Sequence, residues 1–533
     1  MTSRVIEGVK ETCGPPEYLI LDGQQRLTSI FRAAHSTYPV ETTTDKGQKI
    51  YRYYYLDINK CLDDTIDRLD AIVSIPEDRK IKTNFNRDIV LNISTREHEY
   101  NLGMFPINII FDSNAREDWA DGYKEFYKNT AECKAIYKKF RTEVLDTITG
   151  YKLPVITLDR KTPREAICKI FENVNTGGIP LTVFELVTAT FAAQSFDLRE
   201  DWEKCKETIH GTGEMLNTDV MCGVDETDFL TAITLYTSFK SSASTSCKRK
   251  DVLALSYEDY KKNKPAILEG FKLARKFLLR QFVFRQRDLP YTTQLIPLSA
   301  ICAAIGESTF EKPRTSEILT QWYWCGVLGE MYGGANETRY ANDIDDVVEA
   351  IRDGTEIRTI NAAFFSSTRL LTMQTRLSAA YKGVMALIYK EGGKDFLRGT
   401  GMDVVKSMDE TPDIHHIFPE SWCKKQNFPK EKWNSIVNKT PLLPATNRSI
   451  GGNAPSIYSK RIMESSGIDE KEFSIRIQSN LIDYYSFMQD DFNTYFTARA
   501  KRLLNIIENA MHKKVADKGA EQTIKQFGTS LED

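Results

Sequence analysis

Apolar side chains recur at every third or fourth position through most of residues 191–400. That spacing matches the period of an α-helix and predicts a series of amphipathic helices. Two stretches break the pattern, the Ser- and Lys-rich residues 240–251 and the glycine-bounded residues 393–401, and we expect both to be loops. The expected helices cover residues 226–240, 256–284, 292–305, 315–331 and 368–392.

The first 190 residues follow a different pattern, in which short apolar runs alternate with helical stretches. Thr182 and Glu185 fit the N-cap and N3 positions of a capping box at the start of a helix from Val183 onwards. This part is predicted to be a mixed α/β domain. Its other expected helices lie at 131–148 and 162–174, and runs rich in β-branched and aromatic residues predict strands at 18–21, 50–56, 104–111 and 153–158.

A third pattern starts near residue 403, where a short strand, a loop and a helix precede a helical tail at 470–514. The last residues are polar and are expected to fray. Because 533 residues are too many for one core, we predict a multi-domain α+β protein with domains at 1–190, 191–402 and 403–533. The expected core of the tail is Ile482, Tyr485, Phe487, Phe492, Tyr495 and Phe496.

Composition limits the classes of partner. The formal net charge is −3, so a surface that binds a polyanion would have to be local. Residues 413–464 supply such an excess, with eight Lys and Arg against four Asp and Glu. A solvated charged face remains the alternative interpretation. The excess indicates Lys439, Arg448 and Lys460 as candidate DNA contacts.

The cysteines and the apolar runs indicate the compartment. Ten cysteines are scattered without a Cys-x-x-Cys pair, which argues against a zinc site built from such pairs. No apolar run reaches the ~20 residues of a membrane span, and no signal peptide precedes Val5. We therefore expect a cytoplasmic protein with reduced thiols and no membrane partner.

A pair of adjacent histidines is the strongest chemical signal. His415 and His416 stand before Pro419, and Asn438 and Asn447 follow, nine positions apart. A strand, a loop with the first asparagine and a helix with the second would form a ββα-metal pocket. There one imidazole can activate water while another side chain holds a divalent cation, which is the chemistry of phosphodiester cleavage. Two structural histidines near a proline turn are the alternative.

A second signal lies near the N-terminus, where an apolar strand runs into the sequence Asp-Gly-Gln-Gln-Arg at residues 22–26. A helix start suits a phosphate, Gly23 permits close approach, and the guanidinium of Arg26 can bind phosphate oxygens in a fork. A capping box formed by Asp22 and Gln25 is the alternative. The Asn-Thr-Gly-Gly turn at 175–178 could close over a nucleotide or be an ordinary loop.

These segments, in this order, resemble the GmrSD family. Residues 21–29 are similar to the signature of its ParB-like N-terminal domain, residues 171–186 to that domain's second signature, and the histidine segment to its C-terminal HNH nuclease domain. The resemblance implies a domain that binds and hydrolyses GTP or ATP, coupled to an HNH domain that cuts DNA in prokaryotic defence against modified or foreign DNA. It leaves a homo-oligomer open.

The resemblance also implies the role of each residue. His416 would be the general base, Asn438 would hold the central loop or orient the histidine, and His415 and Asn447 would bind Mg²⁺ or Mn²⁺. The implied nucleotide contacts are Asp22, Gly23, Gln24, Gln25, Arg26, Asn175, Gly177 and Gly178.

One departure from the family concerns the N-terminal site. Members carry a longer segment with a Gln-Arg-x-Tyr-x-Trp-like motif before the turn, whereas only 21 residues precede Asp22 here and none forms that motif. We therefore expect either a longer natural N-terminus or an incomplete nucleotide site.

Two alternative functions remain open for the whole protein. One is a DNA-nicking enzyme that needs no nucleotide, and the other is a non-catalytic module that binds DNA or nucleotide.

Overall fold

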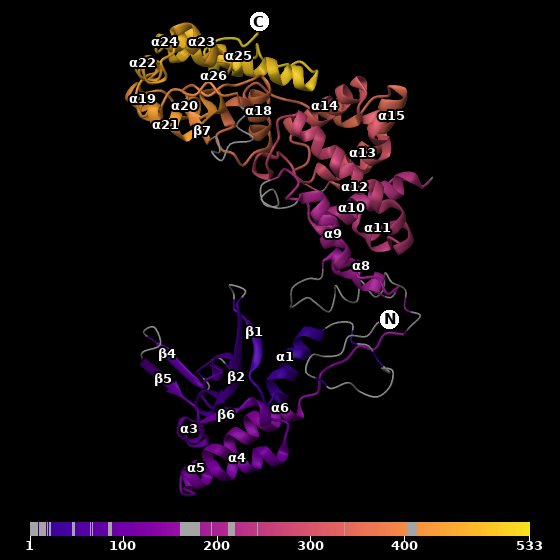
Figure 1. Ribbon diagram of the computed structural model, residues 1–533, viewed down its shortest axis with the longest axis vertical. Coiled ribbons are helices and arrows are strands. Elements are labelled where there is room, and N and C mark those ends of the chain that lie inside the picture. Colours follow the sequence, from indigo (N-terminus) through magenta and orange to yellow (C-terminus); the bar gives the residue numbers. More distant parts are fainter. Residues whose placement is uncertain are drawn as a thin grey trace. The chain divides into compact units, whose positions relative to one another are not determined.

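The protein is an α+β molecule, described by a computed structural model that divides into two compact units, residues 1–167 and 168–533 (Figure 1). Among the helices described, none is both long and apolar enough to cross a membrane. The structure describes residues 9, 18, 20, 23–44, 48–63, 65–66, 68–83, 88–159, 162, 182–192, 194–211, 219–241, 244–334, 336–401 and 413–532.

A small antiparallel sheet forms the centre of the first unit. Strand β2 (Lys49–Asp57) pairs with β3 (Ile72–Pro76) along one edge. Its other edge is shared by β1 (Val40–Thr43) and β6 (Met104–Pro106), with Arg52 opposite Val40 and Tyr55 opposite Pro106. Strands β4 (Lys80–Thr83) and β5 (Asp88–Asn92) form a separate hairpin.

The strand predictions for this unit have different outcomes. The prediction at 50–56 is confirmed by β2, whereas the one at 104–111 holds only as far as Pro106, where a 3₁₀ turn η2 (Ile107–Ile109) begins. The prediction at 153–158 is wrong, because residues 151–159 form no strand and Val155 is 82% exposed. A strand needs a partner ladder as well as β-branched residues. Residues 19 and 21 of the predicted strand at 18–21, and nearly all of the predicted helix at 162–174, lie outside the described residues.

Helices cover the sheet of this unit. The buried Trp119 of α4 packs with Phe105 of β6 and with Tyr137 of α5, which builds an aromatic core. The expected helix at 131–148 is confirmed as a continuous run with a π-helical turn in the middle. The elements are α1 (Gln24–His35), α2 (Ile58–Cys61), η1 (Arg68–Ala71), α3 (Arg96–Leu102), α4 (Ser113–Phe126), α5 (Ala131–Phe140), η3 (Arg141–Leu145) and α6 (Asp146–Gly150).

The second unit begins with a helical region. The predicted capping box is confirmed, because Thr182 N–H donates to Glu185 at 2.8 Å and Glu185 N–H donates to the Thr182 hydroxyl at 3.2 Å. The helices expected between 226 and 331 are confirmed, whereas the one at 368–392 is two helices. The elements are α8 (Val183–Ala192), α9 (Leu198–His210), α10 (Glu226–Lys240), α11 (Arg249–Ala254), α12 (Tyr257–Arg280), η5 (Gln286–Asp288), α13 (Leu295–Phe310), α14 (Pro313–Leu328), α15 (Glu337–Asp353), α16 (Arg358–Ala362), α17 (Arg369–Thr372) and α18 (Ala379–Lys390).

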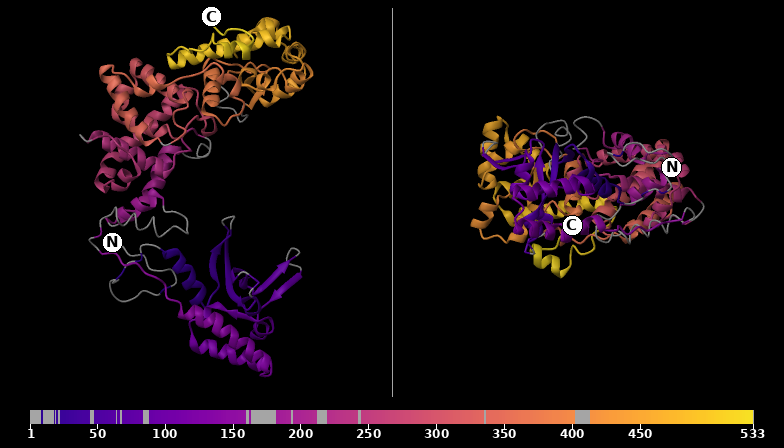
Figure 2. Two further views of the ribbon diagram at one scale, coloured as in Figure 1. Left: turned by 180° about the vertical axis from the view of Figure 1, so that it is seen from behind. Right: turned by 90° about the horizontal axis from the view of Figure 1, so that it is seen from below.

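The C-terminal region adds a two-stranded ribbon and a layer of helices. The long helix α25 lies along α14 and α18 (Figure 2). The elements are β7 (Asp413–His416), α19 (Glu420–Lys425), α20 (Lys430–Trp433), η7 (Ile436–Asn438), β8 (Lys439–Leu442), α21 (Pro444–Ile450), α22 (Pro455–Ser466), α23 (Glu470–Gln478), α24 (Tyr484–Met488), α25 (Phe492–Met511) and α26 (Glu521–Phe527).

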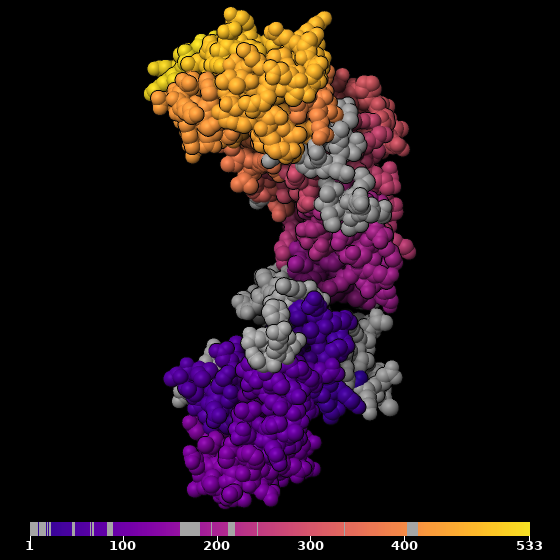
Figure 3. Space-filling view, turned by 60° about the vertical axis from the view of Figure 1, so that its left-hand side comes forward, coloured from indigo at the N-terminus to yellow at the C-terminus, as the bar shows by residue number. Residues whose placement is uncertain are grey.

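Two predictions for the tail are wrong. Tyr485 is 76% exposed, because it stands two positions before the buried Phe487 in α24 and so lies on the opposite side of that helix. The last residues do not fray, because Phe527 and Leu531 are buried. One hydrophobic core runs from Val183 to Leu531, and the surface of this unit is continuous from its magenta to its yellow residues (Figure 3).

A buried arginine joins α25 to the segment between the two strands of the ribbon. Arg499 is fully buried, and its guanidinium donates to the backbone carbonyls of Val437 at 2.6 Å, Lys439 at 2.8 Å and Asn480 at 3.3 Å. Buried carbonyls need such partners, because an unsatisfied one costs free energy. Arg499 therefore fixes the entry to β8.

Replacing Arg499 with Ala should lower the free energy of unfolding by about 2–5 kcal/mol, because several buried carbonyls lose their donor. Arg502→Ala is the matched control on the same helix. Its ion pair with Asp483 is solvent-accessible, so the loss should stay below about 1 kcal/mol. Urea unfolding measures both variants, and equal losses would contradict the bracing role of Arg499.

Candidate active site

The two histidines lie on a strand–loop–strand–helix segment. Strand β7 pairs antiparallel with β8, which places His415 opposite Thr440 and His416 opposite Lys439. Pro419 follows the strand and precedes α19. Pro444 stands at the first turn of α21, where a missing N–H costs nothing, and α21 carries Asn447. The expected order of strand, loop and helix is therefore present, with β8 between the loop and the helix.

His415, His416 and Asn447 line one hollow of about 440 Å³. Glu420 and Lys424 of α19 form part of its wall and pair with each other at 2.6 Å. The structure thus brings together three of the four residues predicted for this site. Side chains from β7 and α21 face the same space, as a reaction between a bound water and a substrate would require.

Hydrogen bonding sets the protonation of His416. Its Nε2 lies 3.2 Å from Oδ1 of Asn434, and an amide oxygen can only accept, so Nε2 carries the proton. Nδ1 then has the lone pair that can take a proton from water. The ring also packs edge-on against Trp433, with centroids 5.7 Å apart. Both contacts hold the imidazole in one orientation.

The environment keeps both imidazoles neutral. Burial lowers the pKa of His416 from its ordinary 6.5, and the charge of Lys439 acts in the same direction, although the hydrogen bond to Asn434 opposes them. Burial and the charge of Arg376 lower the pKa of His415. A neutral imidazole is the form that accepts a proton or binds a cation.

His415 has the properties of a candidate metal ligand. Its Nε2 is buried and has no hydrogen-bond partner within the described part of the chain. A buried polar atom without a partner is costly unless a ligand satisfies it. The same part of the chain holds no group of three His, Cys, Asp or Glu side chains suited to a metal. His415 and the amide oxygen of Asn447 are candidate donors on this lining, which also holds the carboxylate of Glu420, and so few protein ligands would leave positions for water and phosphate oxygens.

Asn438 braces the loop and does not line the hollow. Its side-chain NH₂ donates to the carbonyls of Phe418 and Trp433, both at 2.9 Å, and its Oδ1 accepts from Phe418 N–H at 2.9 Å. These contacts tie the end of β7 to the end of α20. Of the two roles expected for Asn438, holding the loop is the one these contacts serve.

Lys439 is placed differently from its expected role as a DNA contact. It is 7% exposed, and its ammonium donates to the backbone carbonyl of Gln374 at 2.6 Å. Burial lowers the pKa of this lysine to about 8. Its side chain therefore points into the protein. Arg448 and Lys460 are exposed, as a surface contact requires.

No sequence pattern pointed to the groups that orient His416. Asn434 Nδ2 donates to Gln374 Oε1 at 3.4 Å, and Ile436 N–H donates to the carbonyl of Met373 at 2.9 Å. These contacts cross from residues 373–374 to the loop before β8, and the two polar side chains are 60 positions apart in the chain. Such a pair becomes visible only in the folded protein. Asn434 is therefore a positioning residue that sequence analysis missed.

The N-terminal signature is described only in part. Helix α1 begins at Gln24, with Gly23 at its N-cap in the left-handed region (φ 83°), so the capping box with Asp22 as N-cap is not what starts this helix. Among the described atoms, none lies within 4 Å of the position that a Cβ on Gly23 would take. Gln25 and Arg26 are exposed. Asp22, Asn175, Gly177 and Gly178 lie outside the described residues.

Comparison with known proteins agrees with the N-terminal resemblance. Residues 5–192 match the family model described as "GmrSD restriction endonuclease, N-terminal domain". This part of the chain is similar to the N-terminal domain of the GmrSD family. An uncharacterized protein of Methanocaldococcus jannaschii is 27% identical over 496 residues, which cover 89% of this chain and 78% of that protein. The family description implies a nuclease that acts on DNA.

The lowered pKa of His416 predicts how DNA cleavage at this site would depend on pH. Protonation removes the lone pair, and burial disfavours the protonated form, so the active form persists to a lower pH than for a free histidine. The acid limb of the kcat/KM profile should therefore lie below pH 6.5. A limb at or above that pH would contradict the assignment.

A variant of Asn434 checks the same assignment. The hydrogen bond to Asn434 raises the pKa of His416, so Asn434→Leu should move the acid limb to a still lower pH and reduce kcat. Gln426→Leu is the control, because Gln426 is exposed at the end of α19, and it should leave the pH profile unchanged. Identical profiles for wild type and Asn434→Leu would remove the positioning role.

Proposed function

We propose that this GmrSD-type chain is a metal-dependent DNA endonuclease of the HNH kind, whose site is the hollow lined by His415, His416 and Asn447. The observation that carries the proposal is the pairing of two imidazoles. His415 has a buried nitrogen without a partner among the described residues, and His416 is neutral and held in one orientation. One suits a metal ligand, and the other suits a general base.

The proposed chemistry divides between these side chains. His416 takes a proton from water at Nδ1, while its Nε2–H stays bound to Asn434. His415 and Asn447 would hold Mg²⁺ or Mn²⁺, which polarises a phosphate oxygen when bound. Exposed Arg448 and Lys460 supply positive charge near this segment for the DNA backbone. Defence against modified or foreign DNA is the biological role that the family resemblance supports.

The rival proposals differ in what they need. A nicking enzyme would use the same site on one strand and would need no nucleotide. A non-catalytic module would bind DNA without the base, and it gives no reason for a histidine held in one orientation by Asn434 and Trp433. We therefore favour catalysis.

Binding of GTP or ATP by the N-terminal domain is the second part of the proposal. Its support is the family match over residues 5–192, together with the space that the described residues leave open beside Gly23 at the start of α1. Backbone N–H groups at such a helix start suit a phosphate. A cytoplasmic location would supply both the nucleotide and the DNA.

His416→Ala should reduce the rate of plasmid cleavage by about 10²–10⁴-fold while DNA binding is retained, because general-base catalysis contributes that much. His512→Asn is the control, since His512 is exposed at the end of α25 and its left-handed backbone tolerates asparagine. Cleavage by His416→Ala within a few-fold of wild type would remove this histidine from the mechanism.

Asn447→Ala should raise the Mg²⁺ or Mn²⁺ concentration needed for half-maximal cleavage by at least about tenfold, because a metal donor is lost. Wild-type cleavage should stop in chelator. Ser449→Ala on the same helix is the matched control and should behave as wild type, since its hydroxyl bonds the carbonyl of Ala445 within that helix. Full activity in chelator would exclude the metal.

Arg26→Ala should weaken nucleotide binding by about tenfold to a hundredfold without unfolding the protein, because a charge-assisted phosphate contact is lost. Lys134→Ala, an exposed cation on α5 of the same unit, is the control. Equal nucleotide affinities for wild type and both variants would refute the role of Arg26.

A further inference from the structure

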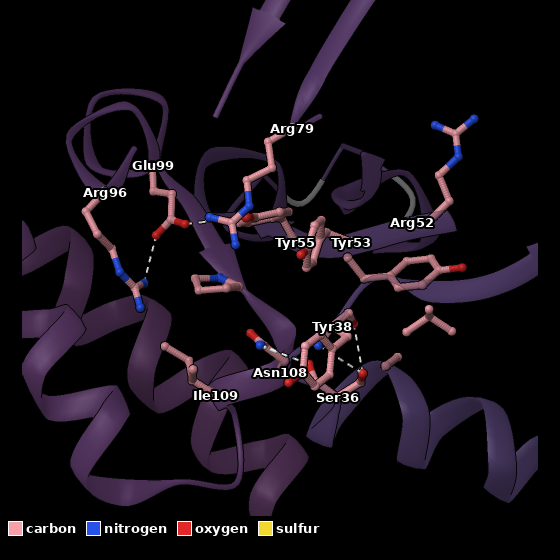
Figure 4. Close-up of a pocket in the computed structure, with 14 residues that line it drawn as sticks. Ser36, Tyr38, Arg52, Tyr53, Tyr55, Arg79, Arg96, Glu99, Asn108 and Ile109 are labelled. Carbon is pink, nitrogen blue, oxygen red and sulfur yellow. Dashed lines mark hydrogen bonds and ion pairs between the residues drawn. The ribbon is translucent and has the colours of Figure 1, made fainter. Parts of the chain in front are cut away.

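A break in the sheet of the first unit opens a small pocket. One edge of β2 pairs with β1 as far as Arg52 and with β6 from Tyr55, so no described strand lies opposite Tyr53 and Tyr54 on that edge. The pocket lies at this break and has a volume of about 100 Å³ (Figure 4). Its polar lining includes Ser36, Tyr38, Arg52, Arg79, Arg96 and Asn108.

The charge in this pocket is positive. Three arginines and one glutamate, Glu99, line it. Glu99 is 2% exposed and already accepts from Arg96 at 2.8 Å, Trp119 Nε1 at 3.1 Å and the Tyr55 hydroxyl at 3.4 Å. Arg96 is its ion-pair partner, and the charge of Glu99 also acts on Arg79. Three guanidinium charges against one carboxylate still leave the lining with an excess of positive charge.

The remaining arginines form no ion pair with a carboxylate among the residues that the structure describes. Of the carboxylates near them in the sheet, Asp78 pairs with Lys82 at 2.5 Å and Glu41 pairs with Lys49 at 2.8 Å. Those ion pairs satisfy the acidic groups locally. A pocket lined by three arginines and one glutamate is suited to a negatively charged ligand.

The backbone conformation of Arg79 directs its side chain into the pocket. Its φ is 54°, in the left-handed region that a long side chain rarely adopts. Two hydrogen bonds hold it there: its N–H donates to the carbonyl of Pro76 at 2.8 Å and its carbonyl accepts from Ile93 at 2.9 Å. The guanidinium then lies 4.7 Å from the centre of the Tyr53 ring (Figure 4). Residues held in such a strained backbone conformation are found mostly at functional sites, including sites that bind ligands.

We propose that this break in the sheet binds one phosphate group of a DNA strand, with Arg79 as its cation and the exposed ring of Tyr38 as a surface for the neighbouring base. The proposal rests on the DNA substrate proposed above and adds a contact in the other unit. Tyr38 is 78% exposed at the rim of the pocket. Guanidinium forks and exposed aromatic rings are the groups that hold phosphates and stack bases.

The volume of the pocket distinguishes a DNA strand from a free nucleotide as its ligand. Pockets for whole small molecules measure roughly 300–1,000 Å³, several times the volume here. This pocket therefore fits one charged group of a longer molecule. It is also distinct from the proposed nucleotide site, because it lies at the end of α1, beside Ser36, about 20 Å along the helix from Gly23.

The test measures DNA binding by the full-length protein in EDTA, so that cleavage does not interfere. A fluorescent oligonucleotide is titrated at several salt concentrations. Arg79→Ala should weaken binding about tenfold and reduce the slope of log affinity against log salt by about 0.7–0.9, the value for one phosphate contact. Arg79→Lys should keep the slope. Arg141→Ala, which removes an exposed arginine of the same unit, should behave as wild type.

Tyr38→Ala provides an independent variant, because an exposed side chain can be removed without unfolding the domain. It should weaken binding about tenfold and leave the salt slope unchanged. Binding and slope equal to wild type in both Arg79→Ala and Tyr38→Ala would overturn the proposal, while wild-type cleavage that depends on His416 would still stand.

Free GTP and ATP distinguish the source of the phosphate. If Arg79→Ala loses affinity for a free nucleotide but binds the oligonucleotide as wild type does, the pocket belongs to a nucleotide and the proposal is wrong. If it loses affinity for the oligonucleotide alone, the DNA strand is the ligand.

Discussion

The histidine segment depends on buried hydrogen bonds that satisfy the backbone of a loop. Between β7 and β8 the chain forms short helices with few regular partners, so its carbonyls must be satisfied from outside. Arg499 of α25 donates to the carbonyls of Val437 and Lys439, and Asn438 ties Phe418 to Trp433. Because an unsatisfied buried carbonyl is costly, these two side chains set the positions of the loop and of the strand that follows it.

This bracing has a direct effect on the chemistry. The strand pairing that it fixes places His416 opposite Lys439, and the loop that it fixes carries Asn434 to the imidazole. Burial by the same packing lowers the pKa of both histidines. Structural and chemical roles are thus divided: Asn438 and Arg499 hold the backbone, while His415, His416 and Asn447 face the hollow.

The sequence predicted those features that local patterns determine. Helical spacing located the middle helices, the Thr182 capping box was read from four residues, and the histidine and asparagine spacing placed three residues around one hollow. Prediction from the sequence failed where contacts between distant parts of the chain determine the position of a side chain. Counting charges could not show that Lys439 turns inward to the carbonyl of Gln374, and the sequence could not show which side of α24 faces the core and which side exposes Tyr485. The pocket at the break in the sheet follows from strand register, which no single strand reveals.

The contacts of residues 373–374 have a consequence for how the histidine segment can be exchanged by recombination. Met373 and Gln374 lie well before β7 in the chain, yet they bond Ile436, Lys439 and Asn434. A recombination breakpoint near residue 403 would therefore separate Met373 and Gln374 from the loop that holds the imidazole of His416. Residues 403–533 alone would therefore not carry all the contacts that hold the site. Recombination between relatives would transfer the histidines together with these contacts only if the breakpoint lay before α17.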